Sequence, residues 1–587
     1  MPDECVAAVL RGLEPEHKPK YFHNSAFDVP RIHRRFGVML DKGVLDTQIA
    51  SRSARAGEWE EVQKGNKTVR PQKKHELDEC LRREGVAEIP KVKQKWTGDL
   101  TEQHLIYAAD DVRYLEELYS RLYGRIEDIG ASAAYDTIAD TLNIFLEAAC
   151  LKVPLDIKKL EAIQEQTSLE KDKAEQTLRS LAQKHASHPE GLEWVWGNTQ
   201  KHTTPEGPGR NGMNRLLSLV GVKLSSLEEQ TLLDNRDAHP IVKALYDYGK
   251  AAKIHSKYAR ILSDFTDECG DLCSQANVVG AVTSRVTYKD PNIQGFHKRT
   301  TKRYRECVRA PEGHLMVKAD YEQQELRIAA FWSQDENLMS AFANGEDVYM
   351  RVAEKIVGEP VSRGTEQGDR ARAAAKRAVL GYLYGLGPDK YRTNVYKDTG
   401  SEVSLEVAHR DREAFRSAFP GFYKWQKSYG SHKDECNLPK PDRWETRSVR
   451  GWRRVVAGQY GRKSDWMKEN NVPAEWIPKY TDRLNGPIQS TAGDILYLTL
   501  QKLNGDFGDY PGTRFLFSVH DEIVLTAPED IAEDVLRWLK SRMVEALEEV
   551  LCPELGGPGS VEGGGGPNWG AVDKWEVAGP LLIPKRI

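Results

Sequence analysis

The sequence predicts a multidomain α/β fold. Its 587 residues, 39% of them hydrophobic, are enough to bury several cores and form two or more domains. Residues 1–128 alternate short apolar runs with helical patterns, and residues 129–275 are mostly helical patterns. The remainder again alternates strand-like and helical segments. We therefore expect an α/β N-terminal domain, a helical middle part and a larger α/β C-terminal part.

Charge and cysteine content exclude several classes of protein. The formal net charge is only −4, so binding to nucleic acid would need local positive surface rather than a global field. The basic stretch HKRTTKRYRECVR at 297–309 is one candidate for such a surface. The eight cysteines form no CxxC pair, and the start lacks the basic region and apolar core of a signal peptide. No run approaches the ~18 apolar residues of a membrane span. We expect a reduced, cytoplasmic protein without a membrane anchor.

Two apolar runs each end in acidic residues. LMVKADYEQQELRIAA carries Asp320, and FLFSVHDEIVL carries Asp521 and Glu522. Packing alone gives no reason to place a carboxylate there, because burying an unpaired charge is costly. Two such carboxylates brought together can hold two divalent metal ions, the arrangement used for phosphoryl transfer. For each aspartate taken singly, a strand-end turn or a helix cap is the alternative.

The segment between these runs contains a helical pattern with a basic end. DRARAAAKRAVLGYLYGLG places Arg372, Lys376, Leu380 and Tyr384 at intervals of four, and at ~1.5 Å per residue they span roughly 18 Å. That is about the length of a nucleoside triphosphate. The two cations would bind phosphates, and the other two side chains would offer apolar surface to sugar and base. A surface helix with a basic stripe is the alternative, but it does not explain GYLYG.

At these residues the chain resembles the family A DNA polymerases. DYEQQELR resembles motif A of that family, RAAAKRAVLGYLYG motif B and VHDE motif C. Four further blocks follow the family's order: TSRVTYKDPNIQ, FRSAFPGFYKW, NGPIQSTAGD and GPNWG. The resemblance implies a right-hand polymerase with palm, fingers and thumb. It also implies a DNA-directed DNA polymerase that adds deoxynucleotides to a primer 3′ end.

The resemblance also divides the chain into domains. The expected parts are 1–128, an exonuclease-like domain; 129–275, the palm start and helical thumb; 276–340, palm with motif A; 341–480, fingers with motif B; and 481–587, palm with motif C. Within the last part, the glycine-rich stretch GGPGSVEGGGG at 556–566 is predicted to be a flexible surface loop.

The resemblance implies the metal site residue by residue. Asp320 and Asp521 would hold two Mg²⁺ ions, which Mn²⁺ could replace, with the carbonyl of Tyr321 as a further ligand and Glu522 in support. One metal would lower the pKa of the primer 3′ hydroxyl, and the other would hold the triphosphate and the leaving pyrophosphate.

The resemblance also implies residues that bind the incoming nucleotide. Arg372 and Lys376 would bind the phosphates, with Lys376 placed to protonate pyrophosphate as it leaves. Glu325 resembles a steric gate that bars a ribose 2′ hydroxyl, with Tyr384 lying under the sugar. Gln323 and Leu380 complete the set of nucleotide-binding candidates.

The implied partners are primer-template DNA and deoxynucleoside triphosphates. The DNA-binding candidates are Arg285, Asn292, Gln294, Asn485, Gln489 and His520. Most of them resemble residues that touch the primer terminus and the nascent pair from the minor groove, where contacts check shape without reading sequence. We expect a monomer in the cytoplasm, and the sequence leaves any processivity factor or helicase open.

The N-terminal region resembles a 3′ to 5′ proofreading exonuclease of ribonuclease H-like fold. HNSAFD offers Asn24 and Asp28, as in the second motif of that family, and YAADD offers Tyr107 and Asp111, as in the third. The first motif, an Asp-x-Glu that supplies the main metal ligands, should lie some tens of residues before Asn24. Only 23 residues precede it, and they contain no such motif. Either the chain begins inside the domain or this lineage has lost the site. We therefore expect a partial exonuclease domain without activity.

Three positions depart from the family pattern. The chain has TSR where TGR is usual, Gln489-Ser490 where Gln-Gly is usual, and Leu380 where an aromatic residue is usual. Leucine at the last position resembles phage enzymes. It favours a viral source and a role in phage or viral DNA replication, in which case the location would be the host cytoplasm.

Three other functions remain as alternatives. A single-subunit RNA polymerase shares the palm and the finger helix, but would not be expected to carry DYxQxELR with a glutamate gate. A nuclease acting through the N-terminal domain lacks half of its metal site. A non-catalytic DNA-binding subunit would have no physical need to keep the two aspartates, Arg372, Lys376 and Tyr384 together.

Overall fold

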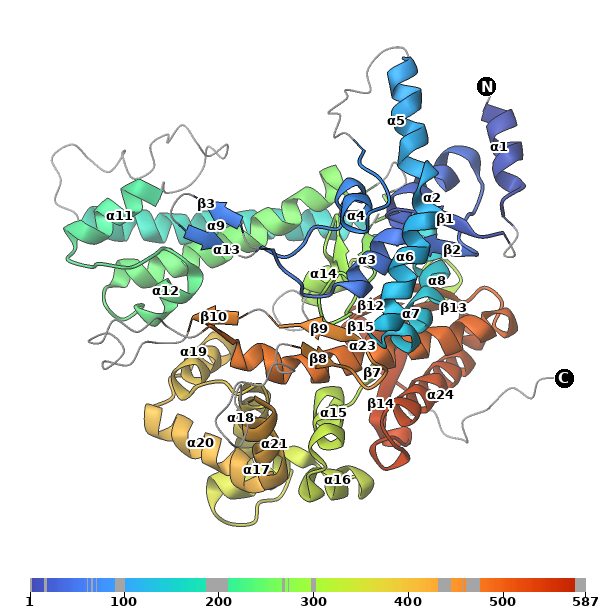
Figure 1. Cartoon of the computed structure of the whole chain (residues 1–587). Coiled ribbons are helices and arrows are strands. Elements are labelled where there is room, and N and C mark those ends of the chain that lie inside the picture. Colours follow the sequence, from blue (N-terminus) through green and yellow to red (C-terminus); the bar gives the residue numbers. More distant parts are fainter. Residues whose placement is uncertain are drawn as a thin grey trace.

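The protein is organised around a five-stranded antiparallel sheet of order β12-β13-β7-β14-β15. The computed structural model describes residues 3–14, 18–60, 62–64, 67–69, 71–89, 101–185, 210–266, 270–272, 274–296, 302–430, 445–456, 458–460 and 476–575 (Figure 1). The strands are β7 (His314–Tyr321), β12 (Arg514–Val519), β13 (Glu522–Pro528), β14 (Val561–Asn568) and β15 (Ala571–Lys574). Strands far apart in the chain therefore meet in one sheet.

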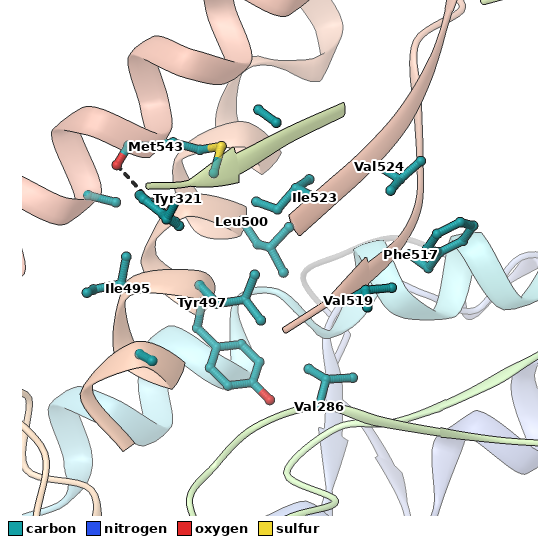
Figure 2. Packing of buried hydrophobic residues seen from close by; sticks show 14 of the residues in the cluster. Val286, Tyr321, Ile495, Tyr497, Leu500, Phe517, Val519, Ile523, Val524 and Met543 are labelled. Atoms are coloured by element: carbon teal, nitrogen blue, oxygen red, sulfur yellow. Dashed lines mark hydrogen bonds between the residues drawn. The ribbon is translucent and has the colours of Figure 1, made fainter. Parts of the chain in front are cut away.

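Two long helices pack against this sheet and close its core. They are α23 (Tyr480–Asp506) and α24 (Ala532–Val550). α24 packs on β7 and β14, and α23 packs on α24. Buried side chains from these elements interdigitate, among them Tyr497, Phe517 and Ile523 (Figure 2). The hydroxyl of Tyr321 donates to the carbonyl of Met543 at 2.8 Å, which satisfies the one polar group that β7 places in this core.

The N-terminal part is mixed, as expected, but its sheet is small. Among its described residues, β1 (Lys20–Phe22) and β2 (Val44–Asp46) pair in parallel, and β3 (Val62–Lys64) pairs with β4 (Lys67–Val69) as a hairpin. Its helices are α1 (Asp3–Arg11), α2 (Ser25–Phe36), α3 (Thr47–Ala54), α4 (Leu77–Arg83), α5 (Glu102–Arg113) and α6 (Leu115–Asp128). Two shorter helices, α7 (Ser132–Ala139) and α8 (Leu142–Leu151), connect this part to the rest.

A helical arm projects from the body, at the left of Figure 1. We call the set α9 (Ile157–His185), α11 (Arg210–Leu219), α12 (Glu229–Asp234) and α13 (Pro240–Asp264) the arm. It has a hydrophobic core of its own, which includes Leu178, Leu216 and Ile241. Residues 186–209, which hold most of the polar Gly/Pro-rich stretch that interrupts the helical pattern, lie outside the described residues. The arm is therefore packed around a core distinct from the main one, to which its helices also contribute Leu160, Ile163 and Ile261.

Five helices form a second body, the block, at the bottom left of Figure 1. The block is α17 (Val348–Val357), α18 (Glu366–Tyr382), α19 (Pro388–Thr399), α20 (Leu405–Ala418) and α21 (Pro420–Gly430). It is joined to β7 through α15 (Gln324–Ser333) and α16 (Glu336–Ala343). Thr365 caps α18 by accepting from the N–H of Gly368.

Short elements complete the molecule. They are β5 (Gln275–Asn277), β6 (Thr287–Lys289), α14 (Lys302–Arg305), β8 (Glu445–Arg447), β9 (Arg453–Val455), β10 (Gly458–Tyr460) and β11 (Trp476–Pro478). No helix among the described residues is both long and apolar enough to cross a membrane.

The arm and the block touch each other away from the sheet. The guanidinium of Arg236, just after α12, lies 3.6 Å from the ring centroid of Tyr396 on α19 and donates to Glu402 at 2.5 Å. The ammonium of Lys397 on α19 donates to the side chain of Gln230 on α12 at 2.7 Å. These contacts join two parts that the chain connects only through the central sheet.

The glycine-rich stretch is not a surface loop, and the prediction for 556–566 is wrong over its second half. Val561–Asn568 form β14, which pairs with β7 along its length. A Cβ on Gly563 would lie 2.7 Å from the carbonyl oxygen of Lys318, and one on Gly566 would lie 2.0 Å from that of Ala571. Only glycine lets the neighbouring backbone come so close. Composition suggested a spacer, whereas close packing explains the glycines.

Gly566→Ala should destabilise the protein, because the added methyl group meets backbone that cannot rotate away. We expect a loss of about 1–3 kcal/mol of unfolding free energy, seen in denaturant unfolding. Gly505→Ala is the matched control, since nothing lies within 4 Å of its Cβ position near the end of α23. The control should be neutral or slightly stabilising. Equal stability of Gly566→Ala and the wild type would contradict this account of β14.

Candidate functional site

The two acidic runs meet at one end of the central sheet. Asp320 is the penultimate residue of β7, directly opposite Glu522 in the antiparallel register of β7 and β13. Asp521 lies in the turn between β12 and β13, and its carbonyl accepts from the N–H of Tyr321 at 3.4 Å. Both aspartates are partly exposed. The preceding residue, His520, has a left-handed backbone with φ of 61°, which tightens the turn.

Glu522 faces inward and is held by three groups. Its side chain is buried, with 1% of the residue exposed, and Oε1 accepts from Arg305 at 3.0 Å and from the indole N–H of Trp569 at 2.8 Å. The ammonium of Lys318 lies 3.7 Å from Oε2. The Arg305 guanidinium also lies 3.8 Å from the Trp569 ring centroid. Glu522 therefore anchors β13 beside β7 and is already engaged by protein groups.

Sequence reasoning missed Glu562. On β14 it stands opposite Asp320, on the other side of β7 from Glu522. The glycine-rich stretch was interpreted as a loop, so nothing in the pattern indicated a carboxylate beside the motif A aspartate. Arg305 and Trp569 were missed as partners of Glu522, because their contact depends on segments far apart in sequence.

The donor set at Asp320 and Asp521 fits a hard divalent cation. Carboxylate and carbonyl oxygens are the ligands that Mg²⁺ prefers, and the carbonyl of Tyr321 belongs to the same strand end. Across the described part of the chain, no group of three or more histidine, cysteine or acidic side chains is placed to hold a metal. A site here would therefore depend on the two aspartates, the carbonyl and groups supplied by a ligand.

The basic end of α18 is organised by residues of α17. Nε of Arg372 donates to Asp347 at 2.5 Å, and the ammonium of Lys376 lies 5.6 Å from the ring centroid of Tyr349. Leu380, one turn further along, is 49% exposed. Three of the four predicted side chains thus lie on α18 as expected. Sequence reasoning did not single out Asp347 or Tyr349.

Tyr384 lies just beyond the helix rather than on it, because the helix expected over residues 369–387 ends five residues earlier. α18 ends at Tyr382, and Gly385 turns the chain with φ of 73°. Burial raises the pKa of Tyr384 well above its usual value, and the nearby Glu325 carboxylate adds to this. Glu325 pairs with Arg285 at 3.0 Å. The predicted gate, tyrosine and arginine therefore form one cluster.

The remaining DNA and nucleotide candidates surround this cluster at different depths. Gln294 donates to the carbonyl of Val286 at 3.0 Å, and the Asn292 side chain accepts from the N–H of Gln294 at 3.1 Å. Asn485, Gln489, Gln323 and His520 are partly or fully exposed. Asn485 and Gln489 lie on α23, and Gln323 precedes α15 with φ of 57°.

The basic stretch before β7 is only partly available as positive surface, since Lys302 and Arg309 are exposed but two other arginines are engaged by carboxylates. Arg305 is 4% exposed and holds Glu522. Arg303 forms a two-point pair with Glu170 of α9, at 3.0 and 3.1 Å. The prediction is therefore wrong for Arg305, because a buried cation cannot reach a phosphate. Lys298 and Arg299 lie outside the described residues.

The exonuclease-like residues come together in part. Asp28 lies in the first turn of α2, and Tyr107 and Asp111 are one turn apart on α5. Burial raises the pKa of Asp28, and Asp46 and then Asp111 add to that effect. Burial also raises the pKa of Asp111. These carboxylates are thus close enough to repel each other. Asn24 occupies the N-cap position of α2 in the left-handed conformation, with φ of 76°, and its side chain makes no capping hydrogen bond.

Asp46 is a further carboxylate near Asp28, and both of its oxygens accept hydrogen bonds. Its Oδ1 accepts from the N–H groups of Asn24, Gln48 and Ile49, and its Oδ2 accepts from the N–H and the hydroxyl of Ser25. A carboxylate with this many donors has few lone pairs left for a metal. Asp46 is therefore poorly suited to act as a third acidic ligand beside Asp28 and Asp111.

Comparison with known proteins places the site in a family. The model of DNA polymerase family A matches residues 157–571, which is more than half of the chain. The chain belongs to DNA polymerase family A. All seven sequence blocks that resemble the family lie inside the matched range, and the residues that resemble exonuclease motifs lie before it.

Individual relatives agree with this assignment. A thermostable DNA polymerase I of Thermus aquaticus is 28% identical over 498 residues, covering 81% of this chain and 53% of that protein. A DNA polymerase I of Chloroflexus aurantiacus is 25% identical over 583 residues, covering 96% of this chain and 56% of that protein. The chain thus spans about half the length of these curated relatives.

A solved structure has the same fold. The POL domain of Pol1 from M. smegmatis, in complex with DNA primer-template and dNTP, superposes with a TM-score of 0.68 at 20% identity. The match covers 97% of this chain and 90% of that one. It confirms the expected right-hand architecture.

Glu522→Ala should cost stability as well as activity, because it leaves Arg305 buried without its partner. Breaking a buried ion pair typically costs about 3–5 kcal/mol, so we expect a clear fall in the thermal unfolding temperature. Glu533→Ala, which removes an exposed carboxylate from α24, is the control and should change little. If both variants melt together with the wild type, Glu522 is not the anchor described here.

Proposed function

We propose that this chain is a DNA-directed DNA polymerase that extends a primer 3′ end from deoxynucleoside triphosphates. The observation that carries the proposal is the meeting of Asp320 and Asp521 at one end of the central sheet, within a chain that carries the α18 cations. Family membership supports the chemistry, and the M. smegmatis neighbour, whose structure holds primer-template and dNTP, supports the partners.

The proposed roles follow from charge and position. Asp320, Asp521 and the carbonyl of Tyr321 would hold two Mg²⁺ ions, which activate the 3′ hydroxyl and stabilise the charge on the leaving pyrophosphate. Arg372 and Lys376 bind the triphosphate, and Lys376 is the proton donor to pyrophosphate. These cations act most strongly as negative charge develops on the phosphates.

We propose that the cluster of Glu325, Tyr384 and Arg285 selects deoxyribose over ribose in the incoming nucleotide. Glu325, held by Arg285 at 3.0 Å, would exclude a 2′ hydroxyl, and Tyr384 would lie under the sugar. Leu380 is exposed, so it would face the incoming nucleotide. It is also the residue on which we base the proposal of a phage or viral role.

The larger parts receive matching roles. We propose that the arm is the thumb, that the block is the fingers, and that the central sheet with α23 and α24 is the palm. Asn292, Gln294, Asn485, Gln489 and His520 would then follow the minor groove of the primer-template.

We also propose that the N-terminal part of this chain has no exonuclease activity. Phosphodiester hydrolysis of this type uses two metal ions, and Asp28 with Asp111 supplies only two carboxylates. Asp46, a further carboxylate near Asp28, already accepts hydrogen bonds from five donors.

Asp320→Ala and Asp521→Ala should each abolish nucleotide incorporation and leave primer-template binding nearly intact, because the metals serve chemistry more than docking. Primer extension with each nucleotide class, together with DNA binding by fluorescence anisotropy, measures both. Asp530→Ala, an exposed carboxylate just beyond the other end of β13, should behave as wild type. Appreciable extension by either active-site variant would exclude the two-metal assignment. Extension by the wild type with ribonucleotides alone would favour an RNA polymerase.

A 3′-labelled single strand should survive incubation with the protein in Mg²⁺ or Mn²⁺ when nucleotides are omitted. The physical reason is that a water without metal activation is a poor nucleophile at neutral pH. Gel analysis should show the same small loss of label for the wild type and for Asp111→Ala. Robust degradation by the wild type that disappears in Asp111→Ala would show that another group completes the exonuclease site.

A further inference from the structure

The two carboxylate oxygens of Asp347, at the start of α17, accept hydrogen bonds from different partners. Its Oδ1 atom accepts from the backbone N–H of Tyr349 at 3.0 Å, which caps the helix. Its Oδ2 atom accepts from Nε of Arg372 at 2.5 Å, and Nη1 of Arg363 lies 3.7 Å from the same atom. One side chain therefore joins the start of α17 to the basic end of α18.

Arg372 is held in a way that leaves its terminal nitrogens for another ligand. Among residues that the structure describes, its side chain makes its hydrogen bond through Nε alone. A guanidinium is a rigid planar fork with five N–H donors, so fixing Nε sets the plane of the whole group. The side chain is 27% exposed, so its two terminal nitrogens are within reach of a ligand.

Tyr349 restrains both cations of α18 from the same turn. Its ring centroid lies 5.3 Å from Cζ of Arg372 and 5.6 Å from Nζ of Lys376, within the range of a cation–π attraction. The residue is 5% exposed, and burial raises its pKa to about 12. The phenol is therefore neutral at pH 7 and adds no charge that would compete with a phosphate.

We propose that Asp347 is a positioning residue for the incoming deoxynucleoside triphosphate, acting through Arg372. The inference rests on the proposed function, since it names a residue that prepares the same phosphate site. An arginine that is already held in one orientation does not lose that side-chain freedom again when a phosphate binds. The triphosphate is bound in both the ground state and the transition state. Loss of the restraint should therefore raise KM and leave kcat nearly unchanged.

Asp347→Asn is the decisive substitution, because asparagine caps a helix as well as aspartate does but carries no charge for Arg372. We expect KM for the nucleotide to rise about three- to tenfold, because binding must then order the Arg372 side chain. The value of kcat should stay within about twofold of wild type. Thermal unfolding should be close to wild type, which separates positioning from folding. Steady-state single-nucleotide incorporation on a primer-template measures both constants.

Glu346→Gln is the matched control. Glu346 precedes Asp347 and pairs with Arg351 at 2.6 Å within the same helix start, so this change removes one negative charge without touching α18. The KM of Glu346→Gln for the nucleotide should stay within about twofold of the wild-type value, which we count as unchanged. A second test is coupling: in an Arg372→Ala background, Asp347→Asn should add little to KM, because its effect passes through Arg372.

Each result decides the inference. A raised KM for Asp347→Asn, absent in Glu346→Gln and absent in the Arg372→Ala background, supports it. An unchanged KM, an equal effect of Glu346→Gln, or an additive effect in the Arg372→Ala background overturns it. Failure of the proposed function is a different result, since the wild type itself would then incorporate no nucleotide.

Discussion

The buried pair between Arg305 and Glu522 is the interaction on which the site depends. It joins α14 to the first residue of β13, and the indole of Trp569 closes the group from the turn after β14. Removing one member of such a pair leaves an uncompensated charge in the interior. β7 lies between β13 and β14, so this group fixes the strand end that carries Asp320. The aspartates can stay partly exposed because their neighbours are locked.

Several arginines in and near the site are paired with carboxylates. This local pairing is consistent with a chain that has a net charge of only −4 and that binds DNA in our proposal. Arg372 is paired with Asp347, Arg285 with Glu325 and Arg303 with Glu170. Each pairing fixes the direction of a guanidinium and lowers the cost of its partial burial. A basic residue in the sequence is therefore not by itself a sign of free positive charge, as Arg303 and Arg305 show.

Local patterns predicted the elements that carry chemistry, and long-range packing decided the rest. The two acidic strand ends and the basic face of α18 follow from apolar runs and helical spacing, which depend on neighbours in sequence. The glycine-rich strand β14 has no such pattern. Its glycines are explained by the carbonyl oxygens of Lys318 and Ala571, which lie too close to leave room for a side chain. Asp347 and Arg305 were equally hidden, because the partners of a charged side chain are set by tertiary contacts.

The contact between arm and block has a mechanical consequence. The two bodies are joined once through the central sheet and again where Arg236 meets Tyr396 and Glu402, so the molecule forms a closed linkage. Without the second contact, the arm and the block could change their orientations independently. With it, a change in the angle between them must first break the contact of Arg236 with Tyr396 and Glu402. That contact is small and polar, and such contacts are individually weak in water. This contact would therefore have to open before the angle between the arm and the block could change.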